Sequence, residues 1–240
     1  FLISCTDPDA HIRIRFHIPT VENLSIVVVY FHQQIQDFEG RVWKIQTDSY
    51  KRELERYGHN TIELAEKIFF YDSLAVAKMI ANNGNDIDRW VFAIRSIKDL
   101  LDNFKFSSKE REEFFNDLKN KFALEFGLNK YTRTQIDKKF RDHRTALTEV
   151  INKQNTDYLS IELIKILTER TENITPIANE LLHLSDSNQL EVSIESLLRS
   201  YIHMNVNRIF RSKQRQHELV LYDFMWRLYK SENRKSLNNI

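Results

Sequence analysis

The chain has 240 residues, of which 42% are hydrophobic and 12% aromatic, and 35 basic and 34 acidic residues leave a formal net charge of +1. This content of apolar side chains excludes a chain that is disordered overall, and the near-neutral charge gives no support for general attraction to nucleic acids or membranes. The single cysteine, Cys5, excludes an intramolecular disulfide and favours a reducing, cytoplasmic location. Only four glycines and three prolines occur, so we expect few tight turns and a mostly helical chain.

The first fifty residues predict a small sheet and one helix. Strands are expected at 1–5 and 11–18, joined by a turn at 7–9 where a proline stands between two aspartates. A helix is expected at about 20–36, and a third strand at about 42–48. The chain begins with phenylalanine and not methionine, so we expect that further residues precede it.

The rest of the chain has helical periodicity. Ser107 and Glu110 form the sequence pattern of a capping box, and the tail from residue 231 is expected to be frayed. The helices are expected at about 61–70, from 73, 87–104, from 108, 132–155, 161–169, 176–184, 191–210 and 213–230. We expect an α+β fold that is predominantly helical, with a small antiparallel sheet near the N-terminus packed against a multi-helix body. The chain is interpreted as a single domain, 1–240, with 102–155 as a helical excursion from it.

The expected second strand carries the first candidate site. Side chains of a strand alternate between its two faces, so the residues at 12, 14, 16 and 18 form an apolar face that is expected to join the core. The opposite face holds two guanidinium and two imidazole groups, from His11, Arg13, Arg15 and His17. Such a row suits a carboxylate or phosphate, because arginine offers a planar, two-pronged set of donors. The alternative is a solvated face of an edge strand.

Two later segments add further candidates. If the run from Tyr50 to Gly58 is extended, Glu53 and Arg56 face differently; if it is helical, they stand at i and i+3, where they can pair. The alternative to a functional role is that this is a surface ion pair of little energetic value. In the helix expected at 191–210, His203 and Asn207 share a face. His203 is the best acid/base candidate of the chain, although a histidine beside an apolar stripe can also be purely structural.

Several motifs are absent from the sequence. There is no glycine-rich phosphate loop, no GxSxG elbow and no histidine or cysteine spacing typical of a zinc site. The longest aliphatic run is too short to span a bilayer. We therefore expect no cofactor, no metal and no membrane-spanning segment.

Taken in order, the stretches DPxxHIRxRF, YxxExxRYG and IHxxxNR resemble one family, the C-terminal elimination domain of class I lanthipeptide dehydratases, also known as the thiopeptide-type bacteriocin biosynthesis domain. The resemblance covers about residues 1–227. It departs from the family pattern at His59, where members often have a second glycine, and at Asn205, where some carry a second histidine.

The resemblance implies a lyase-type β-elimination. It implies that the domain removes glutamate from glutamylated Ser and Thr of a ribosomal precursor peptide, leaving dehydroalanine or dehydrobutyrine. It also implies a glutamylation domain or subunit that uses glutamyl-tRNA, so the chain is either a fragment of a larger dehydratase or one half of a split enzyme. The expected catalytic residues are Arg13, Arg15, Arg56 and His203. The expected substrate-binding residues are Glu53, His11, Asn207 and Tyr50.

Two other functions remain open from the sequence. A pyridine-forming cyclase of a thiopeptide pathway shares this domain, but the complete arginine set favours glutamate elimination. A non-catalytic module that binds a peptide or a partner is the other, for which the basic residues of 133–144 are candidates. The precursor peptide and the oligomeric state, including a homodimer, are also left open.

Overall fold

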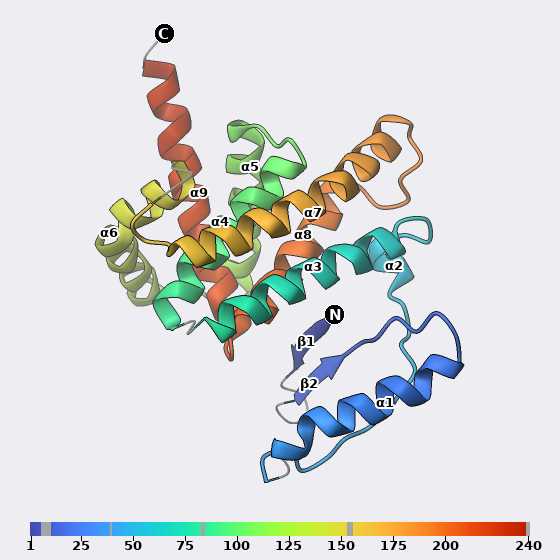
Figure 1. Cartoon of the computed structure of the whole chain (residues 1–240). Coiled ribbons are helices and arrows are strands. Elements are labelled where there is room, and N and C mark those ends of the chain that lie inside the picture. The colour runs from blue at the N-terminus through green and yellow to red at the C-terminus, as the bar shows by residue number, and fades with distance from the viewer. Residues whose placement is uncertain (6–10, 39, 83–84, 153–155, 239–240) are drawn as a thin grey trace.

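The computed structural model describes residues 1–5, 11–38, 40–82, 85–152 and 156–238. Within these ranges it has two strands, nine α-helices and one short 3-10 helix. The strands and helix α1 form a small layer at one side of a larger body of packed helices (Figure 1). This arrangement confirms the expected α+β, predominantly helical fold.

The sheet is smaller than the sequence predicts. Strands β1 (Leu2–Cys5) and β2 (His11–Ile14) pair antiparallel, with Leu2 opposite Ile14. The expected turn at 7–9 lies outside the described residues. The prediction of a strand at 42–48 is wrong, because this segment has irregular backbone structure. Its β-favouring side chains indicate a propensity, whereas a strand also needs a neighbouring edge to pair with.

The apolar face of β2 is not part of the core. Ile12, Ile14 and Phe16 are 69%, 46% and 52% exposed, so the predicted core face is wrong. Helix α1 (Glu22–Ile35) likewise has no buried residue, and its apolar side chains add to this open surface. The reason is that the sheet meets the helical body through β1, which contacts α3 and α8, while β2 and α1 lie farther out (Figure 1).

The helical body follows the sequence expectations with some differences in the bounds. Its largest packed pair is α5 and α9, and the buried side chains of the helices from α3 to α9 belong to one hydrophobic cluster. The remaining elements are η1 (Gln36–Phe38), α2 (Leu54–Tyr57), α3 (Ile62–Ala81), α4 (Asp86–Asn103), α5 (Ser108–Glu125), α6 (Lys130–Asn152), α7 (Ile161–Asp186), α8 (Ile194–Ile209) and α9 (Gln214–Asn238). The buried side chains of α5 and α6 belong to this common cluster. The interpretation of 102–155 as a helical excursion stays a prediction.

Three expected helix boundaries are wrong. Ser73 does not begin a new helix; its hydroxyl donates to the Phe69 carbonyl one turn earlier, so α3 runs through it. Helix α7 continues through Pro176, which the sequence predicts as a helix start. Helix α9 extends to Asn238, so residues 231–238 of the predicted frayed tail are helical, and the Asn233 amide donates to Glu112 of α5 (2.7 Å). The capping box of Ser107 and Glu110 is confirmed.

A buried ionic cluster connects the sheet to the helices. Asp72 of α3 accepts a hydrogen bond from Arg170 Nε of α7 (2.6 Å), and its other oxygen lies 3.6 Å from Arg208 Nη1 of α8. Arg208 Nε in turn donates to the Leu2 carbonyl of β1 (2.9 Å), and the Leu2 amide donates to Ser73 Oγ (3.0 Å). Burial lowers the pKa of Arg208 to about 10, so the guanidinium stays charged near neutral pH. These contacts fix β1, and through it β2, on α3 and α8.

Candidate functional site

Arg15 follows β2 and lies against two aromatic rings. Its guanidinium carbon is 4.3 Å from the centre of the Tyr50 ring and 5.8 Å from that of Phe1. The side chain is half-buried, and its Nε has no hydrogen-bond partner among the described residues. Stacking on an aromatic face holds the guanidinium plane in place without using its N–H donors. Arg15 is therefore held in position by the two rings, with its Nε buried against the protein.

Tyr50 is neutral at ordinary pH. Burial raises the pKa of its phenol to about 12, and the nearby carboxylate of Glu66 adds to this rise. Glu66 is itself held by Arg52, whose Nε and Nη2 donate to its two oxygens at 3.0 and 2.9 Å. Tyr50 can therefore support Arg15 and donate a hydrogen bond, but it does not act as a base near neutral pH.

The Glu53–Arg56 pair forms as its spacing predicts. Arg56 Nη1 lies 2.9 Å from Glu53 Oε2, and each side chain is about half exposed. The next residue, Tyr57, is buried and stacks parallel to Tyr201 of α8, so helix α2 is anchored on the body. Gly58 then turns the chain with φ 79°, and a Cβ there would lie 2.8 Å from Thr61 Oγ1. The geometry thus presents Arg56 to solvent from a fixed turn.

Arg13 and His17 are more open than Arg15, whereas His11 is half-buried like Arg15. Arg13 is exposed, and its Nε donates to His11 Nε2 (3.0 Å). His17 is also exposed. This part of the predicted basic face is therefore solvated, and only Arg15 is enclosed by aromatic rings.

His203 has a different environment. Its Nδ1 lies 2.9 Å from Oε1 of Glu218 on α9, a carboxylate whose side chain is 1% exposed. Glu218 also accepts from the Tyr222 hydroxyl (2.8 Å), and Arg215 Nη1 lies 3.2 Å from its second oxygen. A ring held through Nδ1 by a buried carboxylate has a fixed orientation, and its side chain remains 34% exposed. Asn207, one turn later on α8, is half-buried.

The structure does not bring all the predicted residues together. Tyr201 of α8 faces α2, whereas His203, two residues later, contacts α9. Within the described part of the chain, no contact joins His203 to Arg13, Arg15 or Arg56. We expected these four to meet in one cavity. The contacts place Arg13 and Arg15 at the sheet, Arg56 in an exposed pair with Glu53, and His203 with Glu218 across α8.

Sequence reasoning missed Glu218 and Tyr222. They stand at i and i+4 on α9, where most of the buried side chains are apolar, and both are buried. A carboxylate at an apolar position of an amphipathic helix indicates a buried, paired acid, because an unpaired one would cost too much. That signal was available, but its partner His203 could not be found from α9 alone.

No group of three or more His, Cys, Asp or Glu side chains that could hold a metal ion occurs in the ranges that the structure covers. In the same ranges, none of the helices combines the length and apolar character needed to cross a bilayer.

The family comparison gives the class of protein, a biosynthetic dehydratase domain. The family model described as lantibiotic biosynthesis dehydratase C-term matches residues 1–229, and the chain belongs to this family. Among curated proteins, it is similar to the subtilin biosynthesis protein SpaB of Bacillus subtilis, with 24% identity over 218 residues. This match covers 88% of the chain but 20% of SpaB, so the chain spans about a fifth of the relative's length. The search of solved structures found no match.

Proposed function

We propose that the chain eliminates glutamate from glutamylated Ser and Thr residues of a precursor peptide, as part of lanthipeptide dehydration. Membership of the lantibiotic dehydratase family supports this reaction class. The observation that carries the proposal is Arg15, a half-buried arginine whose guanidinium carbon lies 4.3 Å from the centre of the Tyr50 ring. Its Nε is buried, so the terminal nitrogens of this planar group are the donors that would pair with the carboxylates of a glutamyl ester.

The reaction has three parts. A base removes the α-proton of the modified residue, a donor stabilises the enolate-like oxygen, and the Cβ–O bond breaks as the Cα=Cβ double bond forms. Glutamate leaves as a carboxylate. We assign the binding of the glutamyl group and the stabilisation of negative charge to Arg13, Arg15 and Arg56, with Glu53 orienting Arg56.

The proton transfer is assigned to His203, with Glu218 as its positioning residue. The carboxylate accepts from Nδ1, which leaves Nε2 as the nitrogen that exchanges protons with a substrate. Tyr57, the neighbour of Arg56, packs against Tyr201 on one side of α8, whereas His203 contacts Glu218 of α9. The role of His203 is therefore tested separately from that of the arginines. We assign substrate binding to His11, Tyr50 and Asn207.

The proposed partners follow from the reaction. The substrate is a precursor peptide that carries the glutamyl esters, so a glutamylation domain or subunit must act before this one. SpaB is about five times as long as the matched segment, which leaves room in such a protein for a further activity.

The test is incubation of the purified chain with a synthetic peptide bearing one glutamylated Ser, followed by mass spectrometry. We expect free glutamate and a dehydroalanine peptide, and Arg15→Ala should lower kcat about 100-fold, as removal of one charge-stabilising donor does in other enzymes. Lys67→Ala, an exposed change on α3, is the matched control. The proposal would be wrong if the chain released no glutamate at high enzyme concentration, or if Arg15→Ala reacted like the control.

The role of the imidazole is tested in the same assay. His203→Ala should lower kcat about 100-fold. Glu218→Gln should lower kcat less, leave KM unchanged and shift the acid limb of the kcat–pH profile, since it removes the charge beside Nδ1 but keeps a similar shape. A wild-type pH profile for Glu218→Gln would leave Glu218 with only a structural role.

A further inference from the structure

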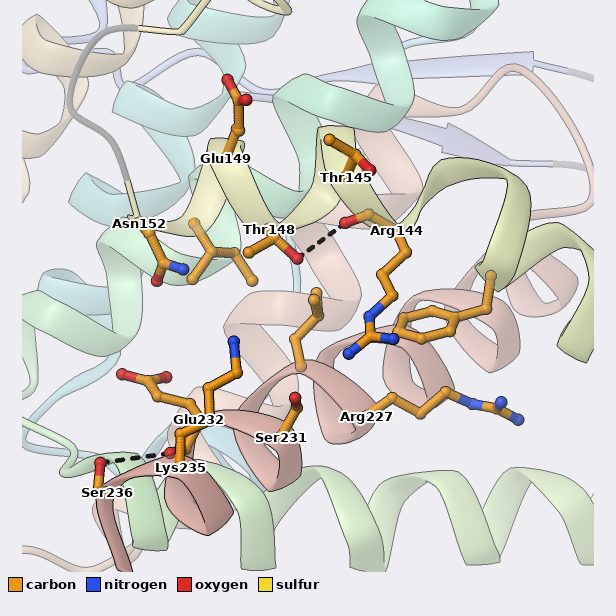
Figure 2. Close-up of a pocket in the computed structure, with 13 residues that line it drawn as sticks. Arg144, Thr145, Thr148, Glu149, Asn152, Arg227, Ser231, Glu232, Lys235 and Ser236 are labelled. Atoms are coloured by element: carbon orange, nitrogen blue, oxygen red, sulfur yellow. Dashed lines mark hydrogen bonds between the residues drawn. The ribbon is translucent and has the colours of Figure 1, made fainter. Parts of the chain in front are cut away.

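A second site lies far from the sheet, where α6 passes α9. A cavity of about 690 Å³ opens between these helices (Figure 2). Phe140, Ile151 and Leu228 are among the residues that line it. Thr148, Asn152 and Ser231 add polar groups to the same walls. The cavity therefore combines an apolar surface with hydrogen-bonding groups, which is typical of a ligand site.

Three of the five charged side chains that line this cavity are cationic, and two of these three form no pair in the described structure. Arg144 and Lys235 extend into the space between the helices (Figure 2), and neither side chain forms a hydrogen bond or ion pair within the described residues. Arg227 differs, because Asp223 and Asp137 each pair with it at 2.5 Å. Of the two acids on the walls, Glu149 points away from the centre and Glu232 lies at the edge (Figure 2).

The basic character continues outward along α9. An adjoining hollow is lined by Arg144, Arg227, Lys230, Arg234 and Lys235, and by no acidic residue. The side chain of Arg234 also has no partner in the part of the chain that the structure describes. This concentration of positive charge contrasts with the net charge of +1 for the whole chain. The positive charges of both the cavity and the hollow would attract an anionic ligand.

The tryptophan of the site argues against a nucleic acid as the ligand. Trp226 lines the outer hollow, but Lys119 Nζ lies 3.5 Å and Lys230 Nζ 4.3 Å from the centre of its ring. The ring is therefore engaged by cations and does not offer an open face for base stacking, on which binding of single strands depends. A peptide needs no such face, because its carboxylates can pair with the cations while an apolar side chain enters the cavity.

We propose that the α6–α9 groove binds a peptide segment in which Asp or Glu residues stand beside large apolar residues. The apolar side chain occupies the space between Phe140, Ile151 and Leu228, and the carboxylates pair with Arg144 and Lys235. The inference rests on the proposed function, in which the substrate is a peptide. It adds a second binding site, separate from the site where the glutamylated Ser or Thr of that peptide reacts.

The test uses two fluorescein-labelled twelve-residue peptides, one alternating Asp and Leu and the other alternating Asn and Leu, with the intact chain. We expect the Asp peptide to bind at least about tenfold more tightly, with an affinity that falls as salt is raised. The double variant Arg144→Glu/Lys235→Glu should lose at least about tenfold in affinity. Lys67→Glu on α3 is the matched charge reversal and should bind like wild type.

The two proposals fail in different ways. Elimination from a short glutamylated peptide without other acidic residues should be unchanged in Arg144→Glu/Lys235→Glu, whereas Arg15→Ala should lose elimination and keep the binding of the Asp peptide. Equal binding of both peptides, or wild-type binding by the folded double variant, would overturn the groove proposal. So would a mixed-sequence RNA that displaces the Asp peptide and binds more tightly than it, since the groove would then serve a nucleic acid.

Discussion

Arg13 and Arg15 differ in environment although they stand two residues apart on one face of the N-terminal segment. Arg15 is stacked on Tyr50, whereas Arg13 is exposed and donates to His11. The alternation of the sequence predicts the shared face, and it does not predict which of the two is enclosed. That difference comes from the segment before α2, which brings Tyr50 beside the sheet.

His217 provides a prediction at the same scale. Its ring stacks on Phe210 with centroids 3.9 Å apart, and burial lowers its pKa, with the charges of Lys139 and Lys213 adding to the effect. The unfolded state therefore takes up a proton more readily than the folded state. The free energy of unfolding therefore decreases as the pH falls below about 6.5, the ordinary histidine pKa, because protonation of His217 favours the unfolded state. Well above this pH, His217 has no such effect.

The measurement is urea denaturation of wild type and His217→Phe at pH values from 8 to 5. Phenylalanine keeps the stacking but cannot be protonated, so the variant should lose less free energy of unfolding than wild type as the pH falls. His143→Phe, at an exposed position, is the control and should follow wild type. A wild-type pH dependence for His217→Phe would contradict the prediction.

Among the elements, α1 is the clearest case of a helix that the sequence predicts correctly but whose environment it does not. Its apolar run Ile26–Val29 is typical of a core helix, yet none of its residues is buried. The sequence pattern indicates the helix itself, whereas its burial requires a partner surface, and the helical body contacts β1 instead.

A substitution series tests this exposure. Ile26→Gln and Val29→Gln should each change the free energy of unfolding by less than about 0.5 kcal/mol, because both positions are exposed. Ile68→Ala on α3, at a fully buried position, should lower it by about 3 kcal/mol. Urea denaturation measures both. Losses at Ile26 similar to that at Ile68 would mean that α1 packs against another surface in solution.

At the scale of the whole molecule, the ionic cluster around Asp72 connects elements that are far apart in the sequence. It joins α3, α7 and α8, and through Arg208 it holds β1, whose Leu2 is far from Arg208 in the sequence. Because Arg13 and Arg15 lie on and beside β2, which pairs with β1, their position relative to the body depends on this cluster.

Asp72→Asn should therefore be strongly destabilising. It removes the negative charge between two buried guanidinium groups, and breaking a buried ion pair in this way typically costs about 3–5 kcal/mol. Glu169→Gln on α7 breaks the exposed pair with Lys78 and should cost less than about 1 kcal/mol. The free energies of unfolding of the two variants, measured by urea denaturation, test the prediction; equal losses would contradict it.

The sequence by itself determined the helical class, most helix positions, the capping box at Ser107 and the Glu53–Arg56 pair, because each depends on residues within a few positions of one another. It also carried the motifs that indicate the family. Only the tertiary structure decided that the apolar face of β2 is open, that His203 pairs with Glu218, and that Arg208 holds β1. The physical reason is that burial and these pairings depend on which helix faces meet, and a local pattern in one element does not specify its neighbour.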